Sequence, residues 1–140
     1  MATLERKRPV VLFRMTSDQF CDLPPSERFK LELLNGEVLM AARPAPTHQH
    51  FIFQLAIIID QWIKAHKLGR ILLDTLMKLN GVWTPAPDIC FLKTAHLKRV
   101  QRKRIVGPVD LAVEVRVPFD APFSPRLFPG LFIDLASLEW

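Results

Sequence analysis

The sequence contains no tyrosine, only two cysteines and no long uninterrupted apolar run. Cys21 and Cys90 lie far apart, and neither has a second cysteine or a histidine at metal-ligand spacing, so no disulfide framework or zinc module is indicated. The longest apolar run, residues 51–59, contains Gln54 and stops at Asp60, far short of the roughly 20 residues of a membrane span. No apolar stretch of the signal-peptide kind follows the charged N-terminus. These absences predict a cytoplasmic protein that does not enter a membrane.

The remaining composition is typical of a folded domain with a mild excess of positive charge. Hydrophobic residues make up 49% of the 140 positions, which is enough to bury a core and argues against disorder. Nineteen Lys and Arg against 14 Asp and Glu give a net charge of +5, which hints at a polyanionic partner. No internal repeat or linker divides the chain. We therefore expect a single domain over residues 1–140.

An Asn-Gly pair predicts a first β-hairpin, because both residues of a tight two-residue turn must accept positive φ. It joins two apolar segments, residues 29–34 and 37–42. In the register that this turn imposes, Glu32 and Glu37 lie on one face of the hairpin. Leucines, a valine and a methionine occupy the other face, which is therefore expected to be buried.

A second Asn-Gly pair predicts a second hairpin, formed by residues 70–79 and 82–92. Two prolines make the first half of its returning strand irregular, and a buried strand is expected to begin at Asp88. The clearest strand is Val109–Val117, in which apolar and polar residues alternate without a break. A last apolar segment, Leu131–Leu135, is also a strand candidate.

Three helices are predicted from threonines that can cap their first turns. The middle helix is apolar on most of its surface and is expected to lie in the core. The last one carries five Lys and Arg residues, which could contact phosphates, although a basic surface helix is more often simply solvated. The helices are expected over residues 17–22, 48–67 and 95–104, after Thr16, Thr47 and Thr94.

Carboxylates on expected strands are the candidates for chemistry. A carboxylate that faces inward from a buried strand is costly unless it is paired or bound to a cation. A Pro-Asp pair ending at Asp88 and, about 25 residues later, Glu114-Val115-Arg116 follow the order of a nuclease motif. Two carboxylates can hold a hard divalent cation, and Arg116 projects from the same strand face as Glu114. The alternative for each acid is an ordinary ion pair on the sheet surface.

Four sequence blocks make this pattern specific, and together they resemble the Uma-type restriction endonuclease family of the PD-(D/E)xK nuclease superfamily. They occur in the order and spacing of that family, from about Met15 to Val115. The blocks are Leu31–Val38, Pro46–Gln49, Pro87–Leu92 and Gly107–Val115.

The resemblance implies an α/β fold with a mixed central sheet flanked by helices, and DNA as the partner. It further implies a catalytic site dependent on Mg²⁺, with Mn²⁺ as a possible substitute. Asp88 and Glu114 match the family's metal ligands, and Glu32 matches its early glutamate as a third acid. His48 matches the family's histidine, although a helix-capping role is an equal alternative. A homodimer is compatible with this interpretation.

The chain departs from the family after about residue 117. The family continues with a Ser-Pro-Ser-Thr-like turn and a helix that bears a lysine, whereas residues 118–140 form a proline-rich tail in which that helix is lost or irregular. Arg116 could fill the cationic corner, but its guanidinium stabilises charge without exchanging a proton.

Three hypotheses follow. The chain is a metal-dependent endonuclease, a nuclease-like module that binds DNA without cutting it, or the product of a frameshift or truncation after Glu114. A plasmid-nicking assay separates the first two hypotheses, and translation of the neighbouring reading frames tests the third.

Overall fold

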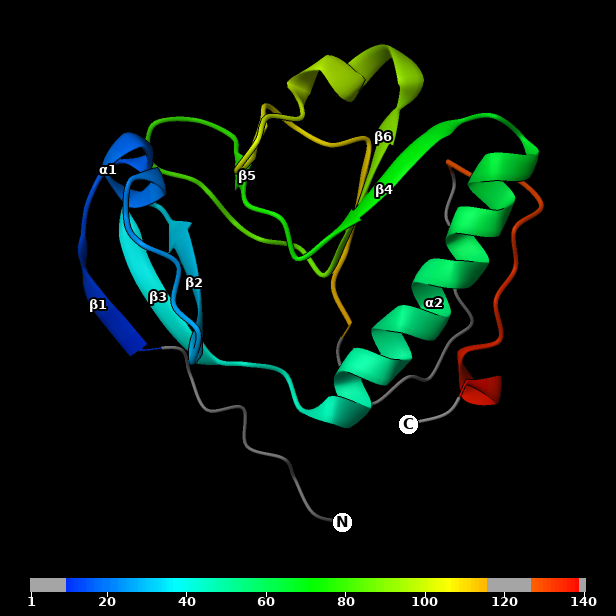
Figure 1. The fold of residues 1–140 in the computed structure, drawn as a ribbon, viewed down its shortest axis with the longest axis horizontal. Coiled ribbons are helices and arrows are strands. Elements are labelled where there is room, and N and C mark those ends of the chain that lie inside the picture. The colour runs from blue at the N-terminus through cyan, green and yellow to red at the C-terminus, as the bar shows by residue number, and fades with distance from the viewer. Residues whose placement is uncertain (1–9, 116–126, 139–140) are drawn as a thin grey trace.

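The computed structural model describes residues 10–115 and 127–138 (Figure 1). Arg116 and most of the proline-rich tail lie outside these residues. Strands predominate along the described chain and are interrupted by two α-helices, with two short 3₁₀ helices, η1 and η2, in its second half. The elements are β1 (Val10–Arg14), α1 (Ser17–Cys21), β2 (Phe29–Leu34), β3 (Glu37–Ala42), α2 (Pro46–Ala65), β4 (Gly69–Leu73), β5 (Met77–Lys78), β6 (Ile89–Lys93), η1 (Thr94–Arg99), β7 (Ile105–Val106), β8 (Leu111–Val113) and η2 (Leu135–Ser137).

The first hairpin has the predicted register. Asn35 and Gly36 adopt φ values of 52° and 75°, so the tight turn places Glu32 of β2 opposite Leu39 of β3. β1 pairs with the other edge of β3 and completes a three-stranded antiparallel sheet. Its apolar face is buried against α1, whose predicted capping box is present.

The central sheet consists of β4, β6 and β8, all antiparallel, and α2 packs against it. The buried stripe of α2 repeats at helical spacing, as predicted, and contacts the buried side chains of β6. The C-terminal segment from residue 127 runs beside α2 and adds Phe128, Leu131 and Ile133 to the same core (Figure 1). This core holds β6, and with it the position of Asp88.

Antiparallel sheets, one parallel pair formed by β5 and β7, and helices together give the mixed α/β fold that was predicted. The strands are divided among three small sheets. The N-terminal sheet is tied to the segment before β6 by a two-way backbone bridge between Leu33 and Thr84, with N···O distances of 3.1 and 2.8 Å. No helix among the described residues is long and apolar enough to cross a membrane.

The second predicted hairpin is only partly correct. β4 does pair with the strand that follows Asp88, but β4 ends at Leu73 and the chain then adopts a positive φ at Asp74. Met77 and Lys78 run parallel to β7, although the Met77 N–H still donates to Pro85 O of the returning segment at 2.8 Å. The two prolines before Asp88 have no N–H to donate, so the returning strand cannot form until β6.

Helix boundaries also differ from expectation. α2 begins at Pro46, with Ala45 rather than Thr47 in the capping position, because a proline in the first turn has no N–H that needs a partner. The predicted helix over residues 95–104 is wrong. Only Thr94–Arg99 is helical, as a 3₁₀ turn, and the chain then reverses because Val100 pairs with Ile105.

The last two predicted strands are shorter or absent. Among the described residues, the strand expected over Val109–Val117 is limited to β8. Leu131–Leu135 does not form a strand of the sheets, although Leu131 and Ile133 are buried as their apolar character suggested. The apolar side chains of this segment pack in the core beside α2, and Ile133 forms only an isolated β-bridge.

Candidate active site

Asp88 stands directly before β6 and is only 8% exposed. Ile89 pairs with Val113, and the antiparallel ladder of β6 and β8 therefore sets Asp88 opposite Glu114. The N–H of Val115 donates a hydrogen bond of 2.8 Å to Asp88 Oδ2. The sheet thus brings the two predicted metal ligands together although they are distant in the sequence.

The pKa of the Glu114 carboxyl is raised well above its usual value. Glu114 is exposed as a residue, but the surrounding protein still removes enough water from its carboxyl to be the main cause that raises its pKa, to about 7. The negative charges of Asp88 and Glu32 raise it further, and Lys30 opposes them. The carboxyls of Glu114 and Asp88 are within hydrogen-bonding reach of each other.

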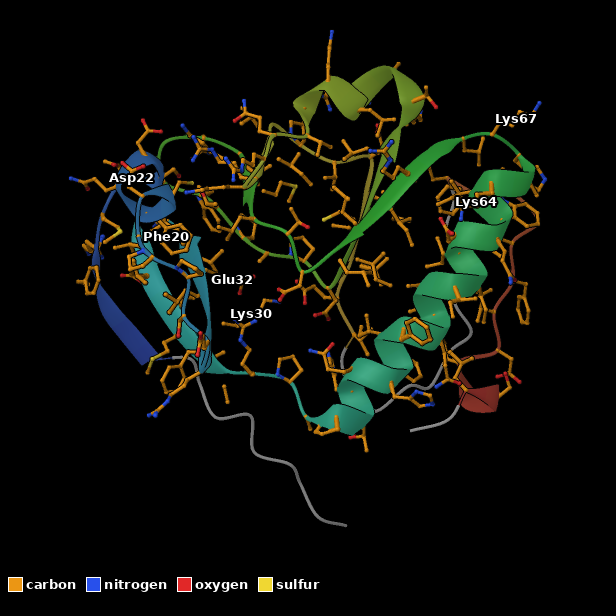
Figure 2. The ribbon with its side chains drawn as sticks, in the orientation of Figure 1. Phe20, Asp22, Lys30, Glu32, Lys64 and Lys67 are labelled. Carbon is orange, nitrogen blue, oxygen red and sulfur yellow. The ribbon has the colours of Figure 1, made fainter. Side chains whose placement is uncertain are left out.

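Glu32 reaches this pair from the N-terminal sheet. Its Oε1 accepts a hydrogen bond of 2.8 Å from the backbone N–H of Ala86, two residues before Asp88. The neighbouring bridge between Leu33 and Thr84 fixes the strand that carries it. Figure 2 shows Lys30 and Glu32 extending from β2 toward the centre of the molecule. Three acids from three separate segments therefore share one electrostatic environment.

The sequence analysis missed a lysine at this position. Lys30 Nζ lies 3.6 Å from Asp88 Oδ1 and 3.7 Å from Asp74 Oδ1, and its side chain is only 14% exposed. A signal for it did exist, because residues two apart on a strand share a face and the hairpin register had already oriented Glu32. The sequence pattern indicated a cationic partner for the acids only at Arg116, next to Glu114.

The structure places His48 at the candidate active site but does not describe Arg116. His48 does not cap α2, whose capping residue is Ala45, and its Nε2 instead lies 3.7 Å from Asp88 Oδ2. Arg116 lies outside the described residues, so its position relative to the acids stays a prediction. Glu37, on the same hairpin face as Glu32, pairs with an arginine of β1 at 2.7 Å.

The residues present fit a hard divalent cation with few protein ligands. Among residues 10–115 and 127–138, no group of three or more His, Cys, Asp and Glu is arranged to hold a metal ion. Mg²⁺, however, is commonly held by one or two carboxylates and completes its shell with waters and substrate phosphates. Asp88 and Glu114 provide such a pair of oxygen ligands, and a cation between them would relieve their mutual repulsion.

Comparison with known proteins identifies the family and the fold. Residues 17–123 match the sequence model of the Uma2 family, described as "Putative restriction endonuclease". The chain is also similar to a solved protein described as "a putative nuclease belonging to DUF820 from Anabaena variabilis", with a TM-score of 0.61 and 20% identity over 76% of the chain. It spans 61% of that protein's length, and at this identity the likeness shows a shared fold. No curated protein sequence matches the chain. Because the family match covers well over half of its residues, the chain belongs to the Uma2 family of putative restriction endonucleases.

Proposed function

We propose that the protein is a metal-dependent endonuclease that hydrolyses phosphodiester bonds in DNA. The observation that carries this proposal is the meeting of Asp88 and Glu114 on adjacent strands, with Lys30 Nζ 3.6 Å from Asp88. Two close carboxylates beside an ammonium group suit a phosphodiester, because they can hold a cation while the lysine attracts the phosphate. Membership in the Uma2 family supports the same activity.

Each residue has a distinct role in this proposal. Asp88 and Glu114 would hold Mg²⁺ or Mn²⁺, which when bound supplies Lewis-acid stabilisation of the charge that develops on the phosphoryl oxygens. Glu32 orients the segment before Asp88 through its bond to the Ala86 N–H. Lys30 provides the fixed positive charge that an endonuclease site of this kind needs. Arg116 could add a second cation.

A plasmid-nicking assay tests the proposal. Supercoiled plasmid incubated with the protein and Mg²⁺ or Mn²⁺ should be converted to open circles, and chelation with EDTA should stop the conversion. We expect Asp88→Asn and Glu114→Gln each to lower the rate by at least about a hundredfold, equal to about 2.7 kcal/mol of transition-state stabilisation. Glu37→Gln changes a partly exposed acid that pairs with Arg14, and it should leave nicking unchanged. Nicking that survives both site variants would show that the activity arises elsewhere.

A second candidate is a DNA-binding module that does not cut. It is favoured by the existing partners of Asp88, whose Oδ1 is near Lys30 and whose Oδ2 is near His48 and the Val115 N–H. Such a carboxylate could serve only to anchor the sheet. This candidate predicts affinity for DNA that needs no metal and falls steeply with salt, together with no nicking under any metal condition.

A further inference from the structure

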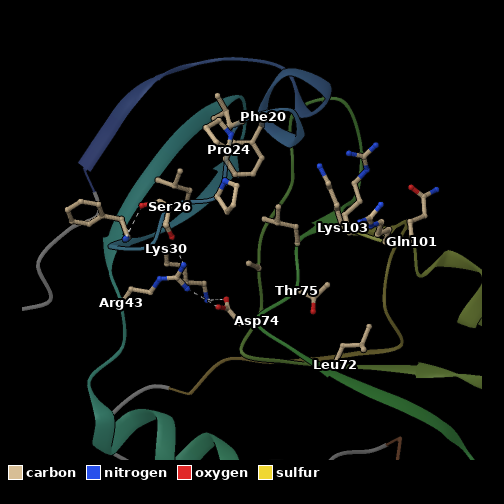
Figure 3. Close-up of a pocket in the computed structure, with 18 of the residues that line it drawn as sticks. Phe20, Pro24, Ser26, Lys30, Arg43, Leu72, Asp74, Thr75, Gln101 and Lys103 are labelled. Carbon is tan, nitrogen blue, oxygen red and sulfur yellow. Dashed lines mark hydrogen bonds and ion pairs between the residues drawn. The ribbon is translucent and has the colours of Figure 1, made fainter.

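A pocket with a volume of about 530 Å³ opens between the N-terminal sheet and the turn of residues 101–104 (Figure 3). This volume is in the range of ligand-binding pockets. Figure 3 shows Gln101 and Lys103 on one side of the pocket, with Lys30, Arg43 and Asp74 across from them. Segments that are distant in the sequence therefore line this open pocket.

The charge around this pocket is strongly unbalanced. Five cationic side chains line it against a single carboxylate, that of Asp74. Asp74 is already shared, because Lys30 Nζ and Arg43 Nη1 lie 3.7 and 3.5 Å from its oxygens. The other three cations belong to the turn, and within the described part of the chain none of them forms an ion pair within 4 Å. They are Arg102, Lys103 and Arg104.

The turn holds these cations in place. Gln101 N–H donates to Arg104 O at 2.8 Å, and Ile105, which is fully buried, donates from its N–H to Leu76 O at 2.8 Å. Arg104 Nε is itself buried without a hydrogen-bond partner in the described structure. A buried donor without a partner is costly, and an anion in the pocket would bring acceptors close to it.

The pocket also adjoins the candidate active site. Lys30 lines the pocket and contacts Asp88, and Ala86 lines it and donates to Glu32. A nucleic-acid strand that places one phosphate at the acids can therefore continue into the pocket. Apolar side chains complete its walls and offer a surface for a base. They include Phe20, Leu23, Pro24, Leu31, Leu72 and Leu76.

Building on the proposed nuclease function, we infer that this pocket binds one unpaired nucleotide next to the bond to be cut. The nucleotide's phosphate contacts the turn of residues 101–104, and its base lies against the apolar wall. A base inside a duplex is paired and stacked, so it can enter only after it has been unstacked, which costs a few kcal/mol. The preferred substrate is therefore single-stranded or frayed DNA.

Binding measured without cleavage tests the inference. The full chain is titrated in EDTA into a fluorescein-labelled single-stranded 12-mer and into the same sequence as a blunt duplex, at low and moderate salt. We expect affinity for the single strand to exceed that for the duplex at least tenfold. Arg102→Gln combined with Lys103→Gln should reduce single-strand affinity at least tenfold, whereas Lys64→Gln combined with Arg70→Gln should reduce it less than threefold. The control removes the same charge from exposed positions outside the pocket.

A third variant separates the cavity from its charge. Thr75→Trp keeps all five cations and fills part of the pocket, so it should weaken single-strand binding while leaving duplex binding unchanged. Thermal unfolding verifies that each variant is folded. If Thr75→Trp does not fold, the combined Arg102→Gln and Lys103→Gln variant, whose changes are both at exposed positions, tests the inference without it. Equal affinity for the two DNA forms, or equal losses in the two double variants, overturns the inference. Single-strand preference without nicking would instead contradict the proposed function and leave the pocket assignment intact.

Discussion

Lys30 is the residue that changes the interpretation of the site. Its side chain is largely shielded from solvent and its ammonium faces Asp88 and Asp74, so it is a cationic residue at the acids where the sequence offered only Arg116. A lysine ammonium is compact and can approach phosphate as a point charge, unlike the planar guanidinium of arginine. No lysine follows Lys103 in the sequence, but Lys30 brings a lysine to the candidate active site.

Substitution of this lysine should separate its role in activity from its role in stability. We expect Lys30→Met to reduce plasmid nicking by about a hundredfold, because the proposed site loses the ammonium beside Asp88. The variant should also unfold at a lower temperature, since Asp88 loses a partner in a mostly buried environment. Lys64→Met, which breaks an exposed pair with Asp60 on α2, is the control and should change neither quantity appreciably. Full activity of Lys30→Met would remove the lysine from the mechanism.

At the scale of elements, Asp110 joins the end of β6 to η1. Its carboxylate accepts from the Lys93 N–H at 2.7 Å and lies 2.9 Å from His96 Nδ1. Burial alone would raise the pKa of Asp110, but the hydrogen bond from Lys93 and the contact with His96 outweigh it and hold the pKa below its usual value. The folded protein therefore stabilises the ionised form of the Asp110 carboxyl.

This arrangement predicts a pH-dependent contribution to stability. A carboxyl whose pKa is lower in the folded state stabilises the fold above its unfolded pKa of about 4, and the contribution is lost as the pH falls through the lower folded value. Asp110→Asn should therefore lower the free energy of unfolding at pH 7 by about 1–3 kcal/mol. Urea unfolding at pH 7, 5 and 3 measures the difference, which should shrink between pH 5 and pH 3 as the carboxyl becomes protonated. A difference as large at pH 3 as at pH 5 would contradict this assignment.

Elements specified by neighbouring residues were predictable, and those specified by distant contacts were not. The Asn-Gly turn after Leu34 and the capping box of Thr16 act within a few residues, and both are present as predicted. The reversal at Val100 depends on its bridge to Ile105 and on the bond of Ile105 to Leu76, which helix propensity does not reveal. For the same reason, the acids could be named from their sequence pattern, while the contact of Lys30 required the fold.

At the scale of the molecule, one core unites α2, the central sheet and the C-terminal segment. Phe128 is 1% exposed and meets Phe91 of β6 edge-on, with ring centroids 4.8 Å apart. The residue follows the proline-rich segment, yet it packs beside the strand that begins after Asp88. The end of the described chain therefore supports the position of the site.

Removal of this aromatic contact should destabilise the whole domain. We expect Phe128→Ala to lower the free energy of unfolding by about 3–5 kcal/mol, because it leaves a cavity in the core. Phe132→Ala is a matched control, since that ring is 66% exposed, and it should cost about 0.5 kcal/mol or less. Chemical denaturation followed by tryptophan fluorescence compares the two variants. Equal losses would show that the C-terminal segment is not part of the cooperative core.

The hydrogen bond from the Val115 N–H to Asp88 also has a consequence for synthesis of the protein. The candidate site takes residues from β2, from the start of β6 and from the end of β8, so it depends on contacts between distant parts of the chain. A nascent chain that has not released Glu114 from the ribosome lacks half of the carboxylate pair. On the proposed function, such a chain lacks the pair that would hold the metal, and activity begins only after nearly all of the family-matched segment has emerged.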